Sequence, residues 1–222
     1  MKKVLCVAPH PDDETLGCGG TLLKHKNDGD QIHWLIVTNI SPKAGFAKSK
    51  VVARQKEVAQ VAKAYGFAGV HKLDLPTAQL DQVAKKTLIE KIAKVIAEVK
   101  PQVVYLPGRF DTHSDHKITF DAFMSVAKTF RAPFIERILM CEIISETEFA
   151  PLSPQTAFIP YSLSDISKFL DKKIAIMKMY KGEMAAHPFP RSEQNIRAVA
   201  THRGAMAGVK YAEAFMIVKE IW

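Results

Sequence analysis

The amino-acid sequence predicts an α/β protein with one Rossmann-like, doubly wound domain: a mostly parallel sheet with helices on both faces. Short apolar runs alternate with longer segments whose apolar residues recur at helical spacing through the first two-thirds of the 222 residues. The apolar runs are continuous, as expected for parallel strands that helices cover on both faces. We therefore expect a single domain over residues 1–222, with its site at the carboxyl ends of the strands and its C-terminal third capping that site.

The first elements can be placed from their apolar patterns. Val4–Ala8 is predicted to be a buried strand, because its apolar run stops at a proline. Thr15–Lys26 is predicted to be a helix, which an Asn-Asp-Gly turn ends. His33–Thr38 is the second predicted strand, and Ser49–Tyr65 is a predicted helix that ends at Gly66.

The middle of the chain continues the alternation. Val70–Leu75 is a short predicted strand, and Leu80–Val99 is a long predicted helix. Val103–Leu106 is a further buried strand, closed by a Pro-Gly pair. The next helix is expected to run through Phe120, Phe123, Val126 and Phe130.

The last third has a different character. Ile138–Ile144 and Ala157–Tyr161 are predicted strands, and Leu163–Tyr180 is a predicted helix. Phe215–Ile221 is expected to close the sheet as a strand. The proline-bearing stretch 185–208 contains no clear element and is expected to cap one end of the sheet.

Composition excludes several classes of protein. With 47% hydrophobic and 24% charged residues, the chain is typical of soluble globular proteins. No apolar run approaches the ~18 residues of a membrane helix, so no membrane insertion is expected. The N-terminal apolar run is shorter than the ~7–15 residues of a signal-peptide core, and we expect a cytoplasmic protein. The three cysteines are too few and too scattered for a disulfide framework or a Cys-rich zinc site, and Cys6 and Cys141, which lie in apolar runs, are expected to be inert core thiols.

The net charge of +8 raises the question of a nucleic-acid partner. The excess comes from 24 lysines dispersed along the chain, with no run of five or more basic residues. Nucleic-acid binders instead concentrate Arg and Lys on one element. We therefore expect a solvated basic surface and no nucleic-acid partner, and this charge would help to attract an anionic substrate.

Side chains typical of metal ligands follow two of the predicted strands. The first segment is His10-Pro11-Asp12-Asp13-Glu14, and the second is Asp111-Thr112-His113-Ser114-Asp115-His116. Both segments emerge on the same edge of a parallel sheet. Two His and one or two Asp without a thiolate suit a catalytic Zn²⁺ with an open position for water. The alternative for each residue alone is a surface or capping role, since an aspartate there could cap the following helix.

These segments resemble the motifs of the PIG-L/LmbE-like zinc-dependent N-deacetylases, which remove acetyl groups from N-acetylglucosamine-type sugars. The first motif is Pro9-His10-Pro11-Asp12-Asp13-Glu14 with the Gly-rich turn that follows it, and the second is His113-Ser114-Asp115-His116. The closing Tyr211–Phe215 (YAEAF) and Arg54 also resemble the family. Gly17, Gly19 and Gly20 do not complete a dinucleotide fingerprint, and we expect them to allow close helix–sheet packing or backbone approach to the sugar.

The resemblance implies a role for each site residue. It implies that His10, Asp13 and His116 bind zinc, and Fe²⁺ or Mn²⁺ would also suit these ligands. It further implies that Asp12 is the general base and that His113, oriented by Asp115, stabilises the oxyanion. Arg54 and His187 are candidate substrate-binding residues, with a structural ion pair and a solvated loop as their respective alternatives.

The function that the resemblance implies is hydrolysis of a linear amide. The enzyme would remove the acetyl group from an N-acetylated amino sugar or sugar conjugate and release acetate and a free amine. One alternative is an amidase that acts on a larger N-acyl group or a sugar–thiol conjugate. Another, outside this class, is a non-catalytic nucleotide- or nucleic-acid-binding Rossmann-like module, which would have no need of the two ligand segments. The expected partner is a small amino-sugar substrate, and the oligomeric state, including a homo-oligomer, stays open.

Overall fold

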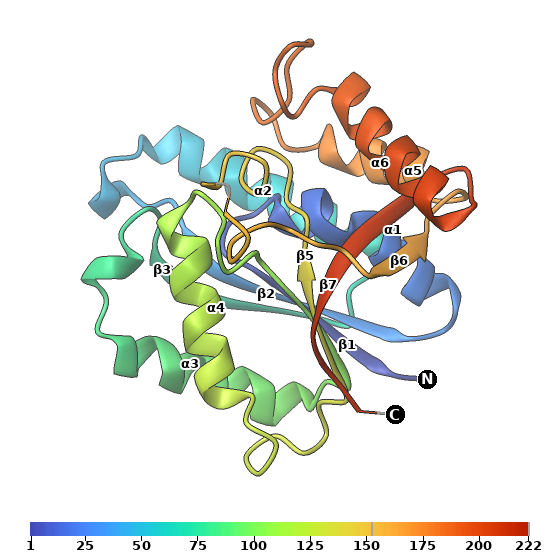
Figure 1. The fold of residues 1–222 in the computed structure, drawn as a ribbon. Coiled ribbons are helices and arrows are strands. Elements are labelled where there is room, and N and C mark those ends of the chain that lie inside the picture. Colours follow the sequence, from blue (N-terminus) through green and yellow to red (C-terminus); the bar gives the residue numbers. More distant parts are fainter. Residues whose placement is uncertain (152, 222) are drawn as a thin grey trace.

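A seven-stranded mixed sheet forms the centre of the computed structural model, which describes residues 1–151 and 153–221 (Figure 1). Its strands are β1 (Lys3–Ala8), β2 (Gln31–Asn39), β3 (Gly69–Pro76), β4 (Val103–Leu106), β5 (Arg137–Cys141), β6 (Ser162–Asp165) and β7 (Ala212–Glu220). They lie in the order β3-β2-β1-β4-β5-β7-β6. Strands β1 to β5 are parallel to their neighbours within this group, whereas β7 is antiparallel to both β5 and β6. The predicted α/β fold with a mostly parallel sheet is confirmed.

Helices cover both faces of the sheet (Figure 1). One face carries α1 (Asp13–Asn27), α2 (Lys48–Tyr65), α5 (Leu170–Met177) and α6 (Glu193–Ala207), and the other carries α3 (Lys85–Val99) and α4 (Ser114–Val126). Strand β1 serves both: Val4, Cys6 and Ala8 join one apolar cluster, and Leu5 and Val7 join the other. No helix among the described residues combines the length and the apolarity needed to cross a membrane.

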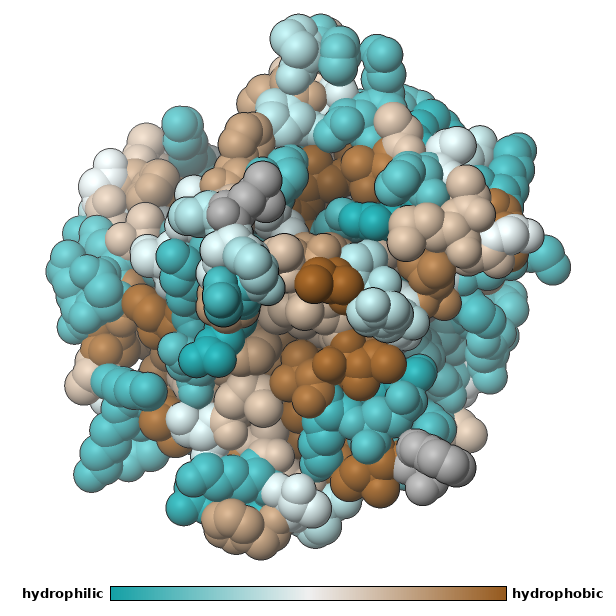
Figure 2. Space-filling view, in the orientation of Figure 1, coloured by the Kyte–Doolittle hydropathy of each residue, from teal (hydrophilic) through white to brown (hydrophobic). Residues whose placement is uncertain are grey.

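Irregular chain covers part of the α3–α4 face. Phe158, in the segment before β6, packs against the apolar cluster of this face, as do Met216 and Val218 of β7. Figure 2 shows apolar residues in the middle of this view, where β7 passes in Figure 1, with hydrophilic residues around them. The last third of the chain therefore completes the sheet with an antiparallel ribbon and a loop.

Two predicted helices are shorter than expected. The predicted helix Leu80–Val99 consists of a 3₁₀ turn, η2 (Leu80–Gln82), followed by α3, because the extended backbone of Val83 separates them. Helix α4 ends at Val126, and Phe130 lies beyond it with 78% of its surface exposed. Phe130 therefore does not belong to the apolar face of that helix.

The predictions for the last third need more correction. The strand placed at Ala157–Tyr161 is wrong, because β6 begins just after it and pairs with β7. The predicted helix Leu163–Tyr180 is wrong at its start, since its first residues belong to β6 and α5 begins only at Leu170.

Helix α6 lies in the stretch for which no element was expected. The side chain of Ser192 caps it by accepting the Asn195 N–H at 3.2 Å. The helix buries only Ile196, Ala200 and Gly204, so the apolar period in its sequence is weak. Two of these three buried residues, Ala200 and Gly204, are small, so the sequence shows no clear apolar face for this helix.

The glycines of α1 allow the helix to lie directly on the sheet. A Cβ at Gly17 would lie 2.9 Å from the Cβ of Cys141, and one at Gly20 would lie 2.7 Å from Ile166 Cγ2. Any side chain at these positions would push the helix away from its neighbours. The expected close packing is confirmed. Cys6 and Cys141 are free and buried, as expected, and Cys18 is buried as well.

A buried ion pair joins α1, α5 and β7. Glu213, in the closing YAEAF segment, accepts the backbone N–H groups of Gly20 at 2.9 Å and Thr21 at 2.7 Å. Lys173 donates to the same carboxylate at 2.7 Å and to the carbonyl oxygen of Leu16 at 2.9 Å. Both side chains are about 95% buried, so the pair connects three elements that are far apart in the sequence.

Candidate metal and catalytic site

The two segments with metal-type ligands meet at one edge of the sheet. One follows β1 and the other follows β4, and these strands are parallel neighbours. A cavity of about 330 Å³ opens there, lined among others by His10, Asp12, Asp13 and His113. The position at the carboxyl ends of adjacent parallel strands is the one that the sequence predicts.

Three donor groups converge on one point of this site. The carboxylate oxygen Oδ2 of Asp13 lies 3.3 Å from His10 Nδ1 and 3.3 Å from His116 Nε2. One donor atom from each of these residues lies within 4.8 Å of the others. His116 Nε2 is buried and makes no hydrogen bond to a described residue. His116 Nε2 is thus a buried nitrogen without a hydrogen-bond partner among the described residues, and it lies beside a carboxylate and a second imidazole. A divalent cation with N and O ligands requires such a set of groups, so these residues fit a metal.

The charges at this point also fit a cation. Burial alone would lower the pKa values of both histidines, but the neighbouring carboxylates outweigh it. The pKa of His10 rises to about 9, through Asp115 and Asp13, and that of His116 rises to about 10, through Asp13 and Asp111. The two histidines in turn hold the pKa of Asp13 below its ordinary value despite burial. Positive charge is therefore favoured here, and a metal ion would take the place of the protons.

Carboxylates orient both imidazole rings from behind. Asp111 Oδ2 lies 2.8 Å from His116 Nδ1 and accepts the Gly108 N–H at 2.9 Å, while its other oxygen accepts from Thr147 at 2.8 Å. These contacts leave His116 Nε2 directed at the converging donors. A carboxylate on the far nitrogen of a ligating histidine is the usual arrangement around protein-bound metals.

Asp115 occupies the same position behind His10. Its Oδ2 lies 3.0 Å from His10 Nε2 and accepts the Ala78 N–H at 2.7 Å, and its Oδ1 accepts the Leu80 N–H at 3.2 Å. The carboxylate of Asp115 therefore pairs with His10 and not, as expected, with His113, which Asp115 contacts only through its backbone N–H. The physical reason is position: hydrogen bonds from His10 and from the backbone N–H groups of Ala78 and Leu80 hold this carboxylate behind the ring of His10.

His113 is held through the backbone instead. Its Nδ1 accepts the backbone N–H of Asp115 at 3.1 Å, which makes His113 the N-cap of α4. Because Nδ1 is an acceptor, the neutral ring carries its proton on Nε2. Burial, together with the charges of His10 and His116, lowers the pKa of His113. This ring therefore presents a neutral N–H donor to the cavity that it lines.

Asp12 is buried beside the converging donors in a strained backbone conformation. Its φ of 136° is rarely adopted by residues other than glycine, and its side chain makes no capping hydrogen bond. Glu14 accepts its N–H at 3.0 Å, and Arg191 donates to its Oδ2 at 2.9 Å. Burial raises the pKa of Asp12 well above its usual range, and Asp13 and Glu183 raise it further. These observations argue against a helix-capping role for this carboxylate.

A chain of ion pairs leads from Asp12 to Arg54. Arg191 binds Glu183 at 3.1 Å as well as Asp12, and Arg54 binds the other oxygen of Glu183 and, at 3.2 Å, Glu57. Arg54 also donates to the Pro11 carbonyl at 3.1 Å. Arg54 therefore forms the structural ion pair that was one alternative for it, and because it also lines the cavity, its role in substrate binding stays a prediction.

Sequence analysis missed Arg191 and Glu183. Both belong to the last third of the chain, and both line the cavity, so this part does cap the site. A single arginine or glutamate in an irregular segment carries no spacing signal, and only the tertiary structure reveals it.

His187 does not reach this site. It is exposed and lines a separate hollow with Met184 and Ser192, near the start of α6. The structure therefore does not bring His187 into the candidate site, and the loop instead turns Arg191 toward Asp12.

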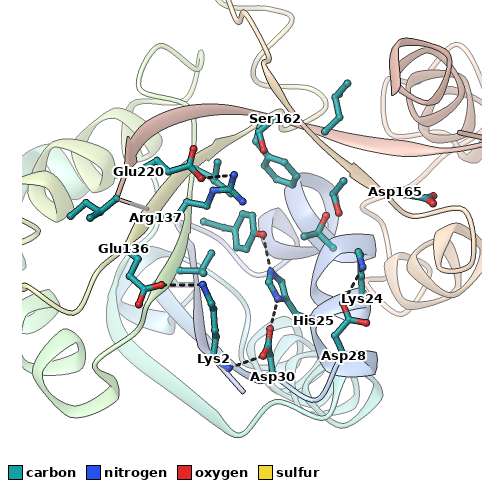
Figure 3. A pocket seen from close by; sticks show the side chains of 18 residues that line it. Lys2, Lys24, His25, Asp28, Asp30, Glu136, Arg137, Ser162, Asp165 and Glu220 are labelled. Carbon is teal, nitrogen blue, oxygen red and sulfur yellow. Dashed lines mark hydrogen bonds and ion pairs between the residues drawn. The ribbon is translucent and has the colours of Figure 1, made fainter. Parts of the chain in front are cut away.

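A larger cavity, of about 830 Å³, lies at the opposite end of the strands (Figure 3). Most of its charged side chains pair with one another, among them Lys2 with Glu136 at 3.0 Å and Arg137 with Glu220 at 2.6 Å. Figure 3 shows His25 beside Asp30, at 2.8 Å, and the other ring nitrogen of His25 lies 2.9 Å from the hydroxyl group of Tyr105. Because these groups already satisfy one another, we place the candidate site in the smaller cavity, where donor atoms converge.

Comparison with known proteins connects this site to an enzyme family. A family model described as PIG-L: GlcNAc-PI de-N-acetylase matches residues 5–127, more than half of the chain. The diacetylchitobiose deacetylase of Thermococcus kodakarensis is 24% identical over 231 residues, covering 100% of this chain and 85% of the relative.

Solved structures share the fold over the whole chain. The conserved protein TT1542 from Thermus thermophilus superposes with a TM-score of 0.77 and 28% identity, covering 100% of this chain and 97% of that protein. The 4-carboxy-2-hydroxymuconate hydratase GalB from Pseudomonas putida superposes with a TM-score of 0.75 and 21% identity, covering 100% and 98%. Since one of these proteins is a hydratase, the fold by itself does not decide the reaction.

Proposed function

Because this chain belongs to the PIG-L family of GlcNAc-PI de-N-acetylases, we propose that it hydrolyses the acetamide of an N-acetylated amino sugar or sugar conjugate. The products would be acetate and a free amine. The observation that carries this proposal is the convergence of His10, Asp13 and His116 beside the buried carboxylate of Asp12. The deacetylase from Thermococcus kodakarensis, whose name gives an N-acetylated disaccharide as substrate, supports the same reaction class.

We infer that His10 Nδ1, Asp13 Oδ2 and His116 Nε2 hold a divalent cation, with Zn²⁺ the best match to this ligand set. Fe²⁺ and Mn²⁺ accept the same ligands. When bound, such an ion polarises a carbonyl group and lowers the pKa of a water molecule toward neutrality.

The chain's own residues supply the proton transfers. Asp12 is placed to accept the proton of the attacking water and to return it to the leaving nitrogen, and its raised pKa suits a base that works near neutral pH. His113 would donate a hydrogen bond from Nε2 to the carbonyl oxygen as negative charge develops there. Arg191 keeps the Asp12 carboxylate oriented.

Product release decides the proposal. Purified protein would be supplied with one equivalent of Zn²⁺, Fe²⁺ or Mn²⁺ and assayed for acetate and free amine. The substrates would be N-acetylglucosamine, its oligomers, and nucleotide-, lipid- and thiol-linked conjugates. Release of acetate in step with amine supports the proposal. Release only from larger N-acyl substrates would favour the alternative amidase, and no amide hydrolysis with any metal would overturn the proposal.

Replacing Asp111 with asparagine is expected to weaken metal binding by about 10–100-fold. The amide oxygen can still accept the Nδ1 proton of His116, but without the negative charge it makes the imidazole a weaker ligand. Competition with a chromophoric chelator would measure the affinity. Asp121→Asn, on the exposed side of α4, is the matched control. Equal affinities in the two variants would contradict the role assigned to Asp111.

Replacing Arg191 with methionine is expected to move the acidic limb of the kcat–pH profile about one unit to higher pH. The guanidinium favours the charged form of Asp12, so its loss raises the pKa of Asp12 further, and the base becomes deprotonated only at higher pH. Profiles of both enzymes would be compared with that of Arg197→Met, whose arginine pairs with Asp171 and Glu193 outside the site. An unchanged limb would show that Arg191 does not act on the base.

A further inference from the structure

We infer that His33 and His71 form a metal site separate from the candidate active site, in which one nitrogen of each imidazole binds a divalent transition-metal ion such as Zn²⁺. The two histidines lie near the amino ends of the neighbouring strands β2 and β3. Leu35 follows His33 by two residues, pairs with His71 and packs on the face that α3 covers, so both imidazoles lie on that face. Because the candidate active site lies at the opposite ends of the strands, this inference does not depend on the proposed function.

The distance between the two histidines suits a shared metal ion better than a hydrogen bond. His33 Nδ1 lies 3.5 Å from His71 Nε2, and the ring centroids are 5.7 Å apart. The nitrogens face each other, because this centroid distance is close to the N–N distance plus the two ring radii. A hydrogen bond from a nitrogen donor is typically about 2.9–3.0 Å long. Two nitrogens that are each about 2.0–2.1 Å from one tetrahedral Zn²⁺ lie about 3.3–3.4 Å apart.

Gly69 leaves the space beside both nitrogens open. It pairs in register with His33, and a Cβ at Gly69 would lie 2.9 Å from His33 Nδ1 and 3.1 Å from His71 Nε2. Gly69 is not among the glycines with a positive φ, so the backbone conformation does not require glycine here. The absence of a side chain instead leaves room for an ion that contacts both imidazoles.

The charged groups around the pair leave both facing nitrogens free to bind a cation. Glu98 Oε1, on α3, lies 3.9 Å from His71 Nδ1 and favours the proton of the neutral ring on that nitrogen, so Nε2 keeps its lone pair. Burial lowers the pKa of His33, and the charges of His71 and Lys3 lower it further. His33 is therefore neutral at neutral pH, as a metal ligand must be. The ammonium of Lys3 disfavours a cation, and the carboxylate of Glu98 offsets this effect.

The other nitrogen of His33 indicates that this histidine does not serve the stability of the sheet. His33 Nε2 is buried and makes no hydrogen bond within the described part of the chain. A buried polar nitrogen without a partner costs free energy, so an apolar side chain at this position would stabilise the fold more. A ligand bound through Nδ1 accounts for a histidine at this position.

The number of bound metal ions tests the inference. Chelator-treated protein would be titrated calorimetrically with Zn²⁺, and circular dichroism would show that each variant is folded. His33→Phe and His71→Phe keep an aromatic ring but remove a ligand nitrogen, whereas Gly69→Ala keeps both histidines and fills the space beside them. His202→Phe, on the exposed side of α6, is the matched control. His116→Ala removes a ligand of the proposed active-site metal and distinguishes the two sites.

We expect His33→Phe, His71→Phe and Gly69→Ala each to bind one equivalent of Zn²⁺ fewer than the wild type, whereas His202→Phe binds as many as the wild type. His116→Ala should retain the equivalent held by His33 and His71, whether or not the candidate active site binds metal.

A further variant keeps the test decisive if a change in the sheet prevents folding. The side chain of Glu98 is 63% exposed, so Glu98→Gln should fold and should weaken binding of this equivalent by about tenfold. Unchanged stoichiometry in the His33, His71 and Gly69 variants, an equal loss in His202→Phe, or unchanged affinity in Glu98→Gln would each overturn the inference. A failure of acetate release in the wild-type assay would count against the proposed function alone.

Discussion

Replacing Asp12 with asparagine is expected to lower kcat by about 10²–10⁴-fold while the metal stays bound. The amide keeps the size of the side chain but cannot accept the proton of the attacking water. The acidic limb of the pH–rate profile should disappear with it, because that limb reports protonation of Asp12. Metal content and the pH dependence of kcat would be measured on the same preparation.

The neighbouring change provides the matched control. Asp13→Asn is chemically identical and one residue away, but it removes a carboxylate that contacts His10 and His116, the two histidines of the proposed metal site. We expect it to weaken metal affinity, and excess metal should restore part of its activity. If Asp12 merely capped α1, its loss would cost ~1 kcal/mol of stability and little rate. Near-normal turnover of Asp12→Asn would overturn the mechanism.

Replacing Glu213 with alanine is expected to reduce the free energy of unfolding by about 3–5 kcal/mol. The change leaves the ammonium of Lys173 and two backbone N–H groups of α1 buried without their acceptor. Urea unfolding would measure the loss. Glu193→Ala breaks the exposed pairs with Lys178 and Arg197 and should cost only about 0–1 kcal/mol.

A second variant keeps this prediction testable if Glu213→Ala does not fold. The double change Glu213→Gln with Lys173→Met removes both charges and retains an acceptor of similar size. It should be more stable than Glu213→Ala, because no unpaired charge remains in the core. Equal losses in Glu213→Ala and Glu193→Ala would show that the buried pair contributes no more than a surface pair.

Local sequence patterns were sufficient for the fold class and for the edge of the sheet at which the two segments with metal-type ligands meet. Apolar runs and helical spacing placed β1 to β4 and helices α1 and α2 to within a few residues, because each is long or strongly apolar. The parallel arrangement then brought His10–Asp13 and His113–His116 to one edge, since the segments follow neighbouring strands. The same patterns failed for α6, which buries only Ile196, Ala200 and Gly204.

The partners of the site residues were decided by the tertiary structure alone. The sequence shows that Asp115 stands two residues from His113, but the carboxylate contacts His10, about a hundred positions earlier, and the backbone of η2 and the residues before it. Arg191 contacts Asp12 across a still longer separation in the sequence, and no sequence motif predicts this contact. Spacing determines which side chains share an element and an edge. The pairing of a particular carboxylate with a particular imidazole or guanidinium depends on how distant segments pack. The reason is that hydrogen bonds in a buried site form between the groups that packing brings within hydrogen-bond distance.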